Sequence, residues 1–346
     1  MTQASAPLSL QHLQTMTGPL GLYQHATIRT PLLREGYCTD DNARAITTLL
    51  YLRPHLSSPQ QASAESVINL AWQFIADSRR ADGTYYNFRA ATDEWLTTTE
   101  SEDMYARLIR ACAVTLQRDA DTHRKKIAAE HLTALLTQAH AFTAVRAIAE
   151  TAVALRALST EWETQVTPLR TKLAALLLQA WREHASDSWP WFENALTYAN
   201  ALLPHGLLAL KPYDSSPRLR KALQASTDFL IATTIKNDMF IPIGSDGWYP
   251  RYGTPSQSNQ QPIEAAAMLD FLLDYHREVS PISSAQLTAP YRWLFGHNTH
   301  NFSLVDLSTG ACRDGLLAGK PNYNCGAESL LAYLFAEARQ RQLLQD

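Results

Sequence analysis

Four segments of the chain combine carboxylates with aromatic, amide or arginine side chains. Their acidic candidates are Asp40, Asp41, Glu193, Glu264 and Asp314. Two carboxyl groups beside a glycosidic bond can hydrolyse it, one as proton donor and the other as base or nucleophile. We therefore take these five acids as catalytic candidates, with Asp40 or Asp41 in one role and Glu193 in the other.

The segment GLYQHATIRTPLLREGYCTDDNARAITTLLY (21–51) is the richest in such side chains. Asp40 and Asp41 come directly before a helical pattern, where acids cap backbone N–H groups and suit the helix dipole. Capping explains one such residue but not the polar residues around it. We predict that four neighbours bind substrate: His25, Arg34, Tyr37 and Asn42.

A second acidic helix start lies in TTTESEDMYARLIRAC (97–112). Thr99 and Glu102 have the spacing of a capping box, which is a structural reason for both. Asp103 and Arg107 are one turn apart and can pair on the helix surface. We favour a structural role for this segment, and we predict that Asp103 is its residue in the substrate-binding site.

The segment DSWPWFENALTYANALLPHGLL (187–208) places Trp189 and Trp191 beside Glu193, with Tyr198 further on. Sugar rings have apolar C–H faces and hydroxyl edges, so an aromatic platform beside acids suits them. The alternative is that these aromatics fill the core, as large aromatics often do. We predict a sugar platform, and we expect His205 to be a core or rim histidine.

Two further segments supply amides and acids. In 240–268 the candidates are Trp248, Gln260, Gln261 and Glu264, the last in the first turn after Pro262. Amides offer the paired donors and acceptors that a polyhydroxylated ligand needs. In 310–338, Asp314 lies in a Gly-flanked turn, where turn formation alone can explain it. Asn324 and Glu328 follow as predicted ligand-binding residues.

Several classes of chemistry lack their motifs. The sequence holds no phosphate-binding loop, dinucleotide fingerprint, serine nucleophile elbow or zinc-binding H-E-x-x-H. Histidines are scattered without metal-ligand spacing, so we expect neither metal nor cofactor. Four cysteines without a C-x-x-C pair predict free thiols. Carboxylate chemistry remains.

Composition narrows the partners. The net charge of −3 and the lack of a basic stripe argue against nucleic acid. No apolar run reaches the roughly 20 residues needed to span a bilayer. The N-terminal residues lack signal-peptide features, so we expect a cytoplasmic protein without membrane attachment.

Helical periodicity must position these residues. Apolar residues recur at i, i+3, i+4 and i+7 in about eleven stretches, among them 66–80, 104–116, 147–159, 168–184, 196–210, 217–234 and 263–279. A helix that runs into a loop rich in Gly, Asp and aromatic residues recurs at 71–88, 177–193, 227–250 and 291–307. Such a repeat predicts an all-α fold, a single (α/α)6 barrel over 1–346. We expect the loops after the inner helices to gather at one end.

Six motifs together resemble a family of bacterial (α/α)6-barrel proteins: GYCTDDNARA, SED-x3-R, WPWFE-x-x-LTY, QQPIEAAAM, C-x-DGL and NYNCGAES. The resemblance covers residues 18 to 338. Members occur alone or fused to retaining glycosyltransferase domains, are often labelled glycosidase or glycosyltransferase, and lie near genes of mannoside metabolism. The chain departs from the pattern at Ala199 and Asn259, where the family usually has Asp, and at Cys325, where Gln is frequent.

Three functions stay open. The leading hypothesis is a glycoside hydrolase for a short oligosaccharide, with mannose-containing glycans as first candidates. The second is a sugar epimerase or isomerase, which needs a proton-shuttling pair such as His25 and His205. The third, which Ala199 and Asn259 favour, is a non-catalytic glycan-binding partner of a separate glycosyltransferase.

Overall fold

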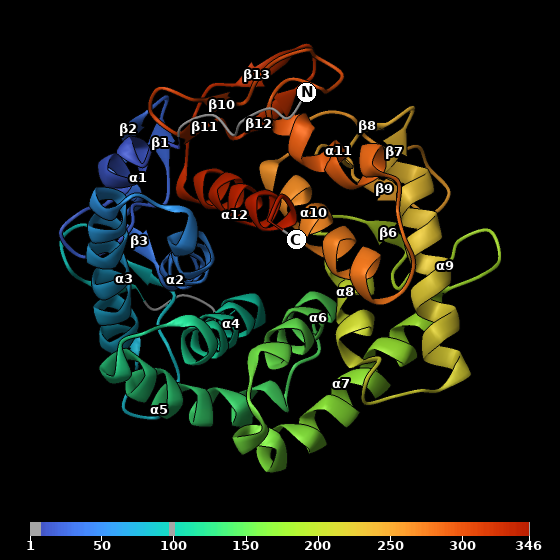
Figure 1. Cartoon of the computed structure of the whole chain (residues 1–346), viewed down its shortest axis with the longest axis horizontal. Coiled ribbons are helices and arrows are strands. Elements are labelled where there is room, and N and C mark those ends of the chain that lie inside the picture. Colours follow the sequence, from blue (N-terminus) through green and yellow to red (C-terminus); the bar gives the residue numbers. More distant parts are fainter. Residues whose placement is uncertain (1–7, 97–100, 346) are drawn as a thin grey trace.

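Two concentric rings of helices build the molecule. The computed structural model describes residues 8–96 and 101–345, and within them twelve α-helices form. The inner ring consists of α2 (Thr39–Leu52), α4 (Glu102–Arg118), α6 (Val145–Ala154), α8 (Leu202–Leu210), α10 (Pro262–Glu278) and α12 (Ala327–Leu343). Each inner helix packs against the next, and α12 closes the ring on α2 (Figure 1).

The outer helices cover this ring. They are α3 (Ser58–Ser78), α5 (Thr122–Ala139), α7 (Glu163–His184), α9 (Pro217–Thr234) and α11 (Ser284–Leu294), while the short α1 (Gln11–Met16) packs beside α12. Short 3-10 turns occupy Leu33–Glu35, Arg53–His55, Leu155–Ala157 and Thr160–Trp162. The predicted all-α (α/α)6 barrel is confirmed.

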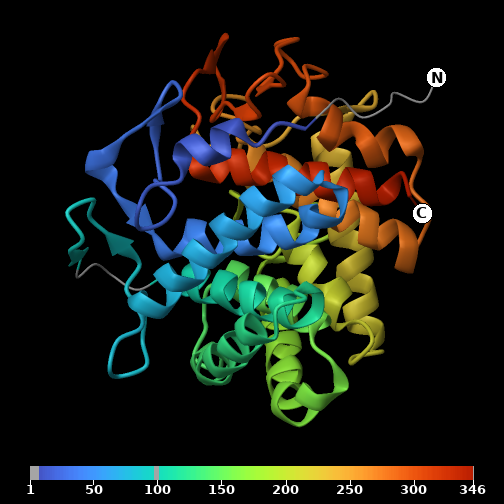
Figure 2. The same cartoon turned by 60° about the vertical axis from the view of Figure 1, so that its left-hand side comes forward.

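The residue patterns explain which helices are inside. All nine residues of α8 are buried, because its sequence LLPHGLLAL is apolar on nearly every side. The outer α7 buries only one stripe, for example Val166, Leu169 and Leu173, and leaves its polar face to solvent. In Figures 1 and 2 α12 runs inside the ring beside α2.

The connection from α5 to α6 consists only of residues 140–144, but long loops connect the other four outer helices to the next inner one. They span 79–101, 185–201, 235–261 and 295–326, and residues 17–38 precede α2 in the same way. The long loops therefore follow the outer helices, not the inner ones as expected, and they gather at the end where the inner helices begin. The repeated helices that end in aromatic clusters are α3, α7, α9 and α11, and these helices pack outside the inner ring.

Short antiparallel strands tie these loops together. The strands are β1 (Ala26–Thr27), β2 (Thr30–Pro31), β3 (Tyr37–Cys38), β4 (Phe88–Arg89), β5 (Trp95–Leu96), β6 (Ala195–Leu196), β7 (Ile235–Lys236), β8 (Met239–Phe240), β9 (Tyr249–Pro250), β10 (Val305–Asp306), β11 (Ala311–Cys312), β12 (Gly315–Leu317) and β13 (Lys320–Asn322).

Three of the pairings join loops from different repeats. The order β3-β4-β5 links the loop before α2 to the loop before α4, and β6 pairs with β9 across the loops before α8 and α10. A bridge between Gln260 and Leu316 joins the loops before α10 and α12. At the left of Figure 2, the loops that carry β1 to β5 project from one end of the barrel.

Two further sequence expectations concern the described chain. All four cysteines are buried and unpaired, as predicted. No helix within 8–96 or 101–345 is both long and apolar enough to cross a membrane.

Candidate functional site

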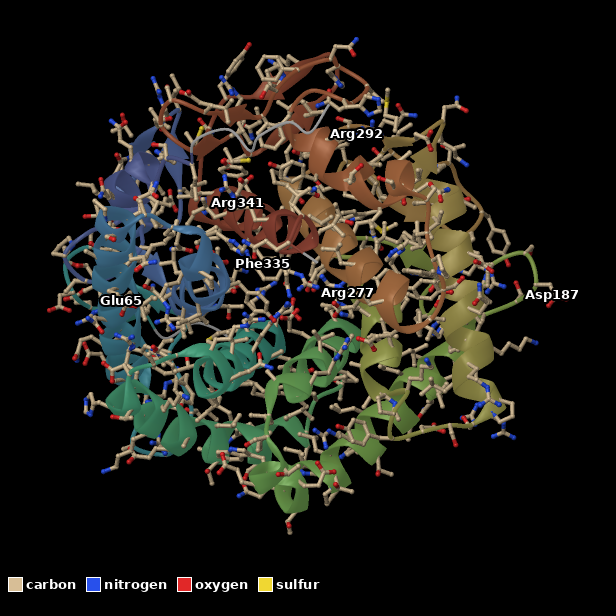
Figure 3. All side chains as sticks on the ribbon, viewed as in Figure 1. Glu65, Asp187, Arg277, Arg292, Phe335 and Arg341 are labelled. Carbon is tan, nitrogen blue, oxygen red and sulfur yellow. The ribbon has the colours of Figure 1, made fainter. Side chains whose placement is uncertain are left out.

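The N-terminal halves of all six inner helices surround one cavity of about 890 Å³, a volume that includes solvent at its mouth. We call it the N-terminal cavity. Its lining residues are Arg44, Thr47, Thr48, Asp103, Arg107, Arg110, Arg146, Glu150, Tyr198, Ala199, Leu202, His205, Ile263, Ala266, Ala267, Asp270, Glu328, Leu331, Ala332 and Phe335. Figure 3 shows Phe335 near the centre of the ring, whereas Asp187 lies at the periphery.

A chain of ion pairs runs along one wall of this cavity. Glu328 at the start of α12 binds Arg44 of α2 at 2.6 Å. Arg44 also binds Asp40 at 3.3 Å, and Asp40 binds Arg107 of α4. Arg44 is thus held by carboxylates from α2 and α12, and Arg107 of α4 by a carboxylate from α2, which fixes the positions of three inner helices relative to one another.

Glu328 is the more exposed of the two acids in these ion pairs, with 44% of its side chain exposed against 21% for Asp40. Partial desolvation acts to raise the pKa of Glu328, but Arg44 and Arg107 outweigh it and leave the pKa below its ordinary value. Glu328 therefore faces the cavity as a carboxylate.

Tyr198 is at the centre of a second part of the cavity wall. Its hydroxyl donates to Asp103 at 2.7 Å, and its carbonyl oxygen accepts from Arg146 at 2.5 Å. The Arg146 guanidinium also lies over the Tyr198 ring and binds Glu193 at 2.8 Å. Among the described residues that line the cavity, Asp103 is the one carboxylate without an arginine partner.

Asp41 lies behind Arg44 and is only 7% exposed. Its carboxyl group accepts from the Cys38 thiol at 3.1 Å, and Arg44 lies 3.8 Å away. Burial raises the pKa of Asp41 to about 7, although Arg44 acts to lower it. Asp41 can hold a proton near neutral pH, which is the property that a general acid requires.

Glu264 is held by the turn before α8. Its carboxylate accepts from the backbone N–H of Ala199, from the Asn200 N–H at 3.4 Å and from the Asn200 side-chain amide at 3.1 Å. Burial raises the pKa of Glu264 to about 7, although these donors act to lower it. Glu264 does not line the cavity, and its carboxylate positions the backbone that carries Tyr198.

Asp314 supports the start of α12. It accepts from the Gly326 N–H at 2.7 Å, and its own N–H donates to the Asn324 carbonyl at 2.7 Å. Burial raises the pKa of Asp314 above its ordinary value. The Asn324 side chain accepts from the Ile28 N–H at 2.9 Å, so both residues hold loops rather than line the cavity.

An ionic floor closes the N-terminal cavity from below. Arg110 binds Glu150 and Asp270, each at 2.8 Å, and Arg339 binds Asp270 at 2.7 Å. His205 binds Asp274 at 3.0 Å on the same level.

A second cavity of about 790 Å³ lies beyond this floor, between the C-terminal ends of the inner helices. We call it the C-terminal cavity. Its residues are Tyr51, Arg110, Val114, Gln117, Arg118, Val153, Ala154, Arg156, Ala157, His205, Asp270, Asp274, Arg277, Glu278, Arg339 and Gln342. Arg110, His205 and Asp270 line both cavities and separate them.

The predicted tryptophan platform does not form. Trp189 is 2% exposed and Trp191 is fully buried, and both pack against Phe229 of α9. Trp189 also donates to the Glu193 carbonyl at 2.8 Å. These rings fill the space between the loop and the outer helices, which is the core role that large aromatics often have.

Other predicted binding residues are buried by the scaffold. Tyr37 is buried and stacks on Tyr23. Asn42 donates to the Cys38 carbonyl at 2.8 Å, and Gln260 accepts from Trp293 at 3.1 Å. Their polar atoms serve the backbone and the core, because a buried amide must be hydrogen-bonded.

The remaining predicted binding residues do not line the cavity wall. His25 and Arg34 are exposed in the loop before α2. Trp248 is half-buried against the core, and Gln261 occupies the N-cap position of α10 without a side-chain capping bond. None of the four lines the N-terminal cavity.

The predicted pair of Asp103 and Arg107 at the start of α4 does not form. Arg107 binds Asp40 instead of Asp103, because Asp103 faces Tyr198. Glu102 accepts from the N–H groups of Thr143 at 2.8 Å and Ala144 at 2.6 Å, before α6. Thr99 lies outside the described residues.

The structure therefore brings three predicted binding residues into the cavity, namely Asp103, Tyr198 and Glu328. The predicted catalytic acids Asp40, Asp41 and Glu193 stand behind the wall, each beside an arginine that lines it. Sequence analysis gave no site role to Arg110, Arg146, Glu150 or Asp270. These residues could have been recognised as charged side chains on the otherwise apolar face of a predicted helix, as in MYARLIRACAV and AIAETAVAL.

No cluster of three or more His, Cys, Asp or Glu side chains that could hold a metal ion occurs within 8–96 and 101–345. The arrangement can bind hydroxyl groups through Asp103, Tyr198 and Glu328, and it holds acids in both protonation states near neutral pH.

Comparisons with known proteins complete the description. No family model matches the sequence, and no curated protein matches it. The fold is similar to that of a cellobiose 2-epimerase from Spirochaeta thermophila, with 14% identity, a TM-score of 0.68 and 97% and 94% of the two chains covered. A D-mannose isomerase has 13% identity and a TM-score of 0.68, with 97% and 95% covered.

An α-1,6-mannanase from Salegentibacter has 10% identity and a TM-score of 0.61, with 96% of both chains covered. That protein is a variant inactivated by replacement of two consecutive aspartates with asparagine, in complex with α-1,6-mannotriose. At these identities the comparisons establish the (α/α)6 barrel fold of the chain.

Proposed function

We propose that this protein is a carbohydrate-processing enzyme, and specifically a glycoside hydrolase that acts on a short oligosaccharide, with mannose-containing glycans as the first candidates. The observation that carries the proposal is the wall of the N-terminal cavity. There the carboxylates Asp103 and Glu328 line the cavity, and Asp41, a carboxyl group whose pKa is about 7, lies behind it 3.8 Å from Arg44.

Hydrolysis needs one protonated and one ionised carboxyl group at the same bond. Asp41 is the proposed proton donor, because burial keeps its proton near neutral pH. Asp103 is the proposed base or nucleophile, because it has a hydroxyl donor and no arginine partner. Glu328 and Arg44 would bind sugar hydroxyl groups at the mouth.

Glu193 is a less suitable partner for Asp41 than the sequence indicated. Arg146 lies within 3.0 Å of both of its carboxylate oxygens, whereas Asp103 has no arginine partner among the described residues. In this proposal Glu193 orients Arg146 and, through it, Tyr198.

The structural neighbours support a carbohydrate ligand. They include sugar epimerases, a sugar isomerase and mannanases. The inactivated mannanase lost two consecutive aspartates, and Asp40 and Asp41 are two consecutive aspartates of this chain.

A sugar epimerase is the second candidate, because His205 lines the cavity and two of these neighbours are epimerases or isomerases. However, His205 is 2% exposed and bound to Asp274. The predicted partner His25 is exposed in the loop before α2 and does not line the cavity. The geometry therefore favours the carboxyl mechanism over a histidine pair.

The test incubates the protein with α-1,6-mannotriose and a panel of neutral disaccharides and trisaccharides, followed by mass spectrometry and chromatography of the products. Hydrolysis shortens the glycan, whereas epimerisation keeps its mass and chain length. We expect shortened products that disappear with Asp103→Asn and with Asp41→Asn. Asp187→Asn, in an exposed peripheral loop, is the matched control and should retain activity.

Products that are isomers of the substrate, with unchanged chain length, would instead support the sugar epimerase. Calorimetric binding of a glycan without any product would support the third hypothesis, a binding partner of a glycosyltransferase.

A further inference from the structure

The N-terminal cavity descends along the barrel axis in successive turns of the same helices. On α4 it is lined by Asp103, then Arg107, then Arg110. On α12 the corresponding series starts at Glu328 and ends at Phe335. Seven residues of α-helix at 1.5 Å each give a depth of about 10 Å, which accommodates about two linked pyranose rings.

The walls enclose this depth on every side. All six inner helices contribute lining residues, so no side of the cavity is left to a loop alone. Below the polar mouth the wall is apolar, with Ala266 and Ala267 from α10 and Leu331 and Ala332 from α12. Such a wall suits the C–H faces of a sugar ring, whose hydroxyl groups then point up or down the axis.

The bottom is closed by packed, paired side chains. Asp270 and His205 are 5% and 2% exposed. Arg110 binds two carboxylates, and its guanidinium lies 5.2 Å from the centre of the Phe335 ring. A glycan cannot pass through this floor into the C-terminal cavity without breaking the ion pairs.

From this one-ended shape we infer that the protein recognises a glycan by its terminus, which enters end-on so that the last one or two sugar rings occupy the N-terminal cavity. The inference rests on the proposed function and deepens it. Cleavage by such a site releases short products from a chain end, and it leaves internal bonds of a long glycan intact.

The first test uses α-1,6-mannotriose as the probe in two capped forms. One form is reduced to the alditol at the reducing end, and the other carries an O-methyl group on its non-reducing terminal sugar. Calorimetry on the full chain measures the affinity of each. We expect one cap to lower the affinity at least tenfold while the other changes it less than twofold.

A product series gives the second reading. With an α-1,6-mannohexaose, end-on cleavage yields monosaccharide or disaccharide from the first minutes, together with the correspondingly shortened chain. Equal affinity for both capped forms, or early products from the middle of the hexaose, would overturn end-on recognition and leave the hydrolase intact. The absence of both binding and cleavage across the neutral panel would instead overturn the proposed function itself, and the inference with it.

A matched pair of variants ties the result to this cavity. Ala267→Leu narrows the N-terminal cavity, and Ala157→Leu makes the same change at a half-buried residue of the C-terminal cavity. We expect Ala267→Leu to lower mannotriose affinity at least tenfold and Ala157→Leu to leave it within twofold. The same affinity for both variants would contradict the assignment.

Discussion

Asp103 differs from the other acids around the barrel axis in its partner. Glu328, Glu150 and Asp270 are each bound by an arginine, whereas Asp103 receives one hydrogen bond, from the hydroxyl of Tyr198. An arginine neutralises a carboxylate, but a hydroxyl donor orients it and leaves its charge available. This contrast between neighbouring residues is the reason for giving Asp103 the central role.

Tyr198→Phe tests that role. The change removes the donor to Asp103 while the ring keeps its place under Arg146. A hydrogen bond to a charged group contributes about 1.5–3 kcal/mol, so we expect kcat/KM to fall about tenfold or more. The melting temperature should fall by no more than a few degrees, since a loss of this size is spread over a large domain. Tyr252→Phe is the control, since Tyr252 is 93% exposed. Equal kcat/KM for the two variants would count against Asp103 and Tyr198 acting together.

Glu264 gives a second prediction, on pH. Its pKa is about 7 in the folded protein and 4.5 as the ordinary value. Because the folded state holds the proton more tightly, the stability that this group contributes is present below pH 4.5 and is lost as the pH rises toward 7. Glu264→Gln removes the titration.

The measurement is urea unfolding of Glu264→Gln and the unmodified protein at pH 4.5, 6 and 7. The free energy of unfolding of the variant should rise relative to that of the unmodified protein over this range. Subtracting the two curves cancels the other titrating groups. A difference that stays constant with pH would show that Glu264 does not titrate there.

At the scale of elements, periodicity located the helices well where one face is apolar. The structure has α9 at Pro217–Thr234, as the pattern over 217–234 predicts. The predicted helix over 196–210 instead begins at Leu202, because residues 195–196 form β6 and Ala199 has a left-handed φ of 45°. A local sequence pattern cannot predict such a turn, because its backbone N–H groups donate to Glu264, which lies on α10.

For the same reason, the local sequence pattern could not show whether an inner or an outer helix precedes each long loop. The recurring unit of an aromatic-ended helix and a loop predicted the barrel, but both inner and outer helices carry apolar stripes. Only packing shows that α3, α7, α9 and α11 are outside. The site residues missed by sequence analysis are charged side chains on inner helices, and their partners come from other repeats.

Close packing between two inner helices yields the third prediction. Gly206 of α8 faces Ala149 of α6, and a Cβ atom added at Gly206 would lie 2.8 Å from the Ala149 Cα. Overpacking of this kind costs about 1–3 kcal/mol, and the gain in helix propensity offsets only about 1 kcal/mol. Chemical denaturation of Gly206→Ala should therefore show a net loss of stability.

Gly253→Ala is the comparison for that variant, because Gly253 lies in an exposed turn. A Cβ atom there meets nothing closer than Pro250 Cδ at 3.3 Å. If Gly206→Ala were as stable as the unmodified protein, α6 and α8 would have to separate more easily than their contact indicates.

At the scale of the whole molecule, the inner helices all point the same way. Their N-terminal ends surround one cavity and their C-terminal ends surround the other. Aligned helices carry partial positive charge at the N-terminal end and partial negative charge at the C-terminal end. Acids such as Asp40, Asp103 and Glu328 lie at the first, and arginines such as Arg118 and Arg339 lie at the second. The dipoles therefore favour carboxylates at the mouth that we assign to sugar binding.

Between the two ends, Asp270 joins opposite sides of the ring. It binds Arg110 of α4 and Arg339 of α12, and it lies 3.9 Å from His205 of α8. Asp270→Asn would remove the carboxylate that Arg110 and Arg339 share, while Arg110 keeps Glu150 and Arg339 keeps Asp274. Loss of one partner from a buried ion pair costs about 3–5 kcal/mol, and the remaining carboxylates place this loss at the lower end of that range. Because these contacts connect several inner helices, the loss should appear as a lower midpoint of one cooperative unfolding transition.

Asp228→Asn on the exposed face of α9 is the matched control. Asp228 accepts only from the Gln224 side chain, so its replacement should stay within about 0.5 kcal/mol. Urea denaturation of the two variants at one pH measures the difference. If Asp270→Asn cost no more than Asp228→Asn, the ion network would be incidental to the barrel, and the floor that closes the N-terminal cavity would open easily. The same result would weaken the case for end-on recognition, because a floor that costs little to break does not stop a glycan chain.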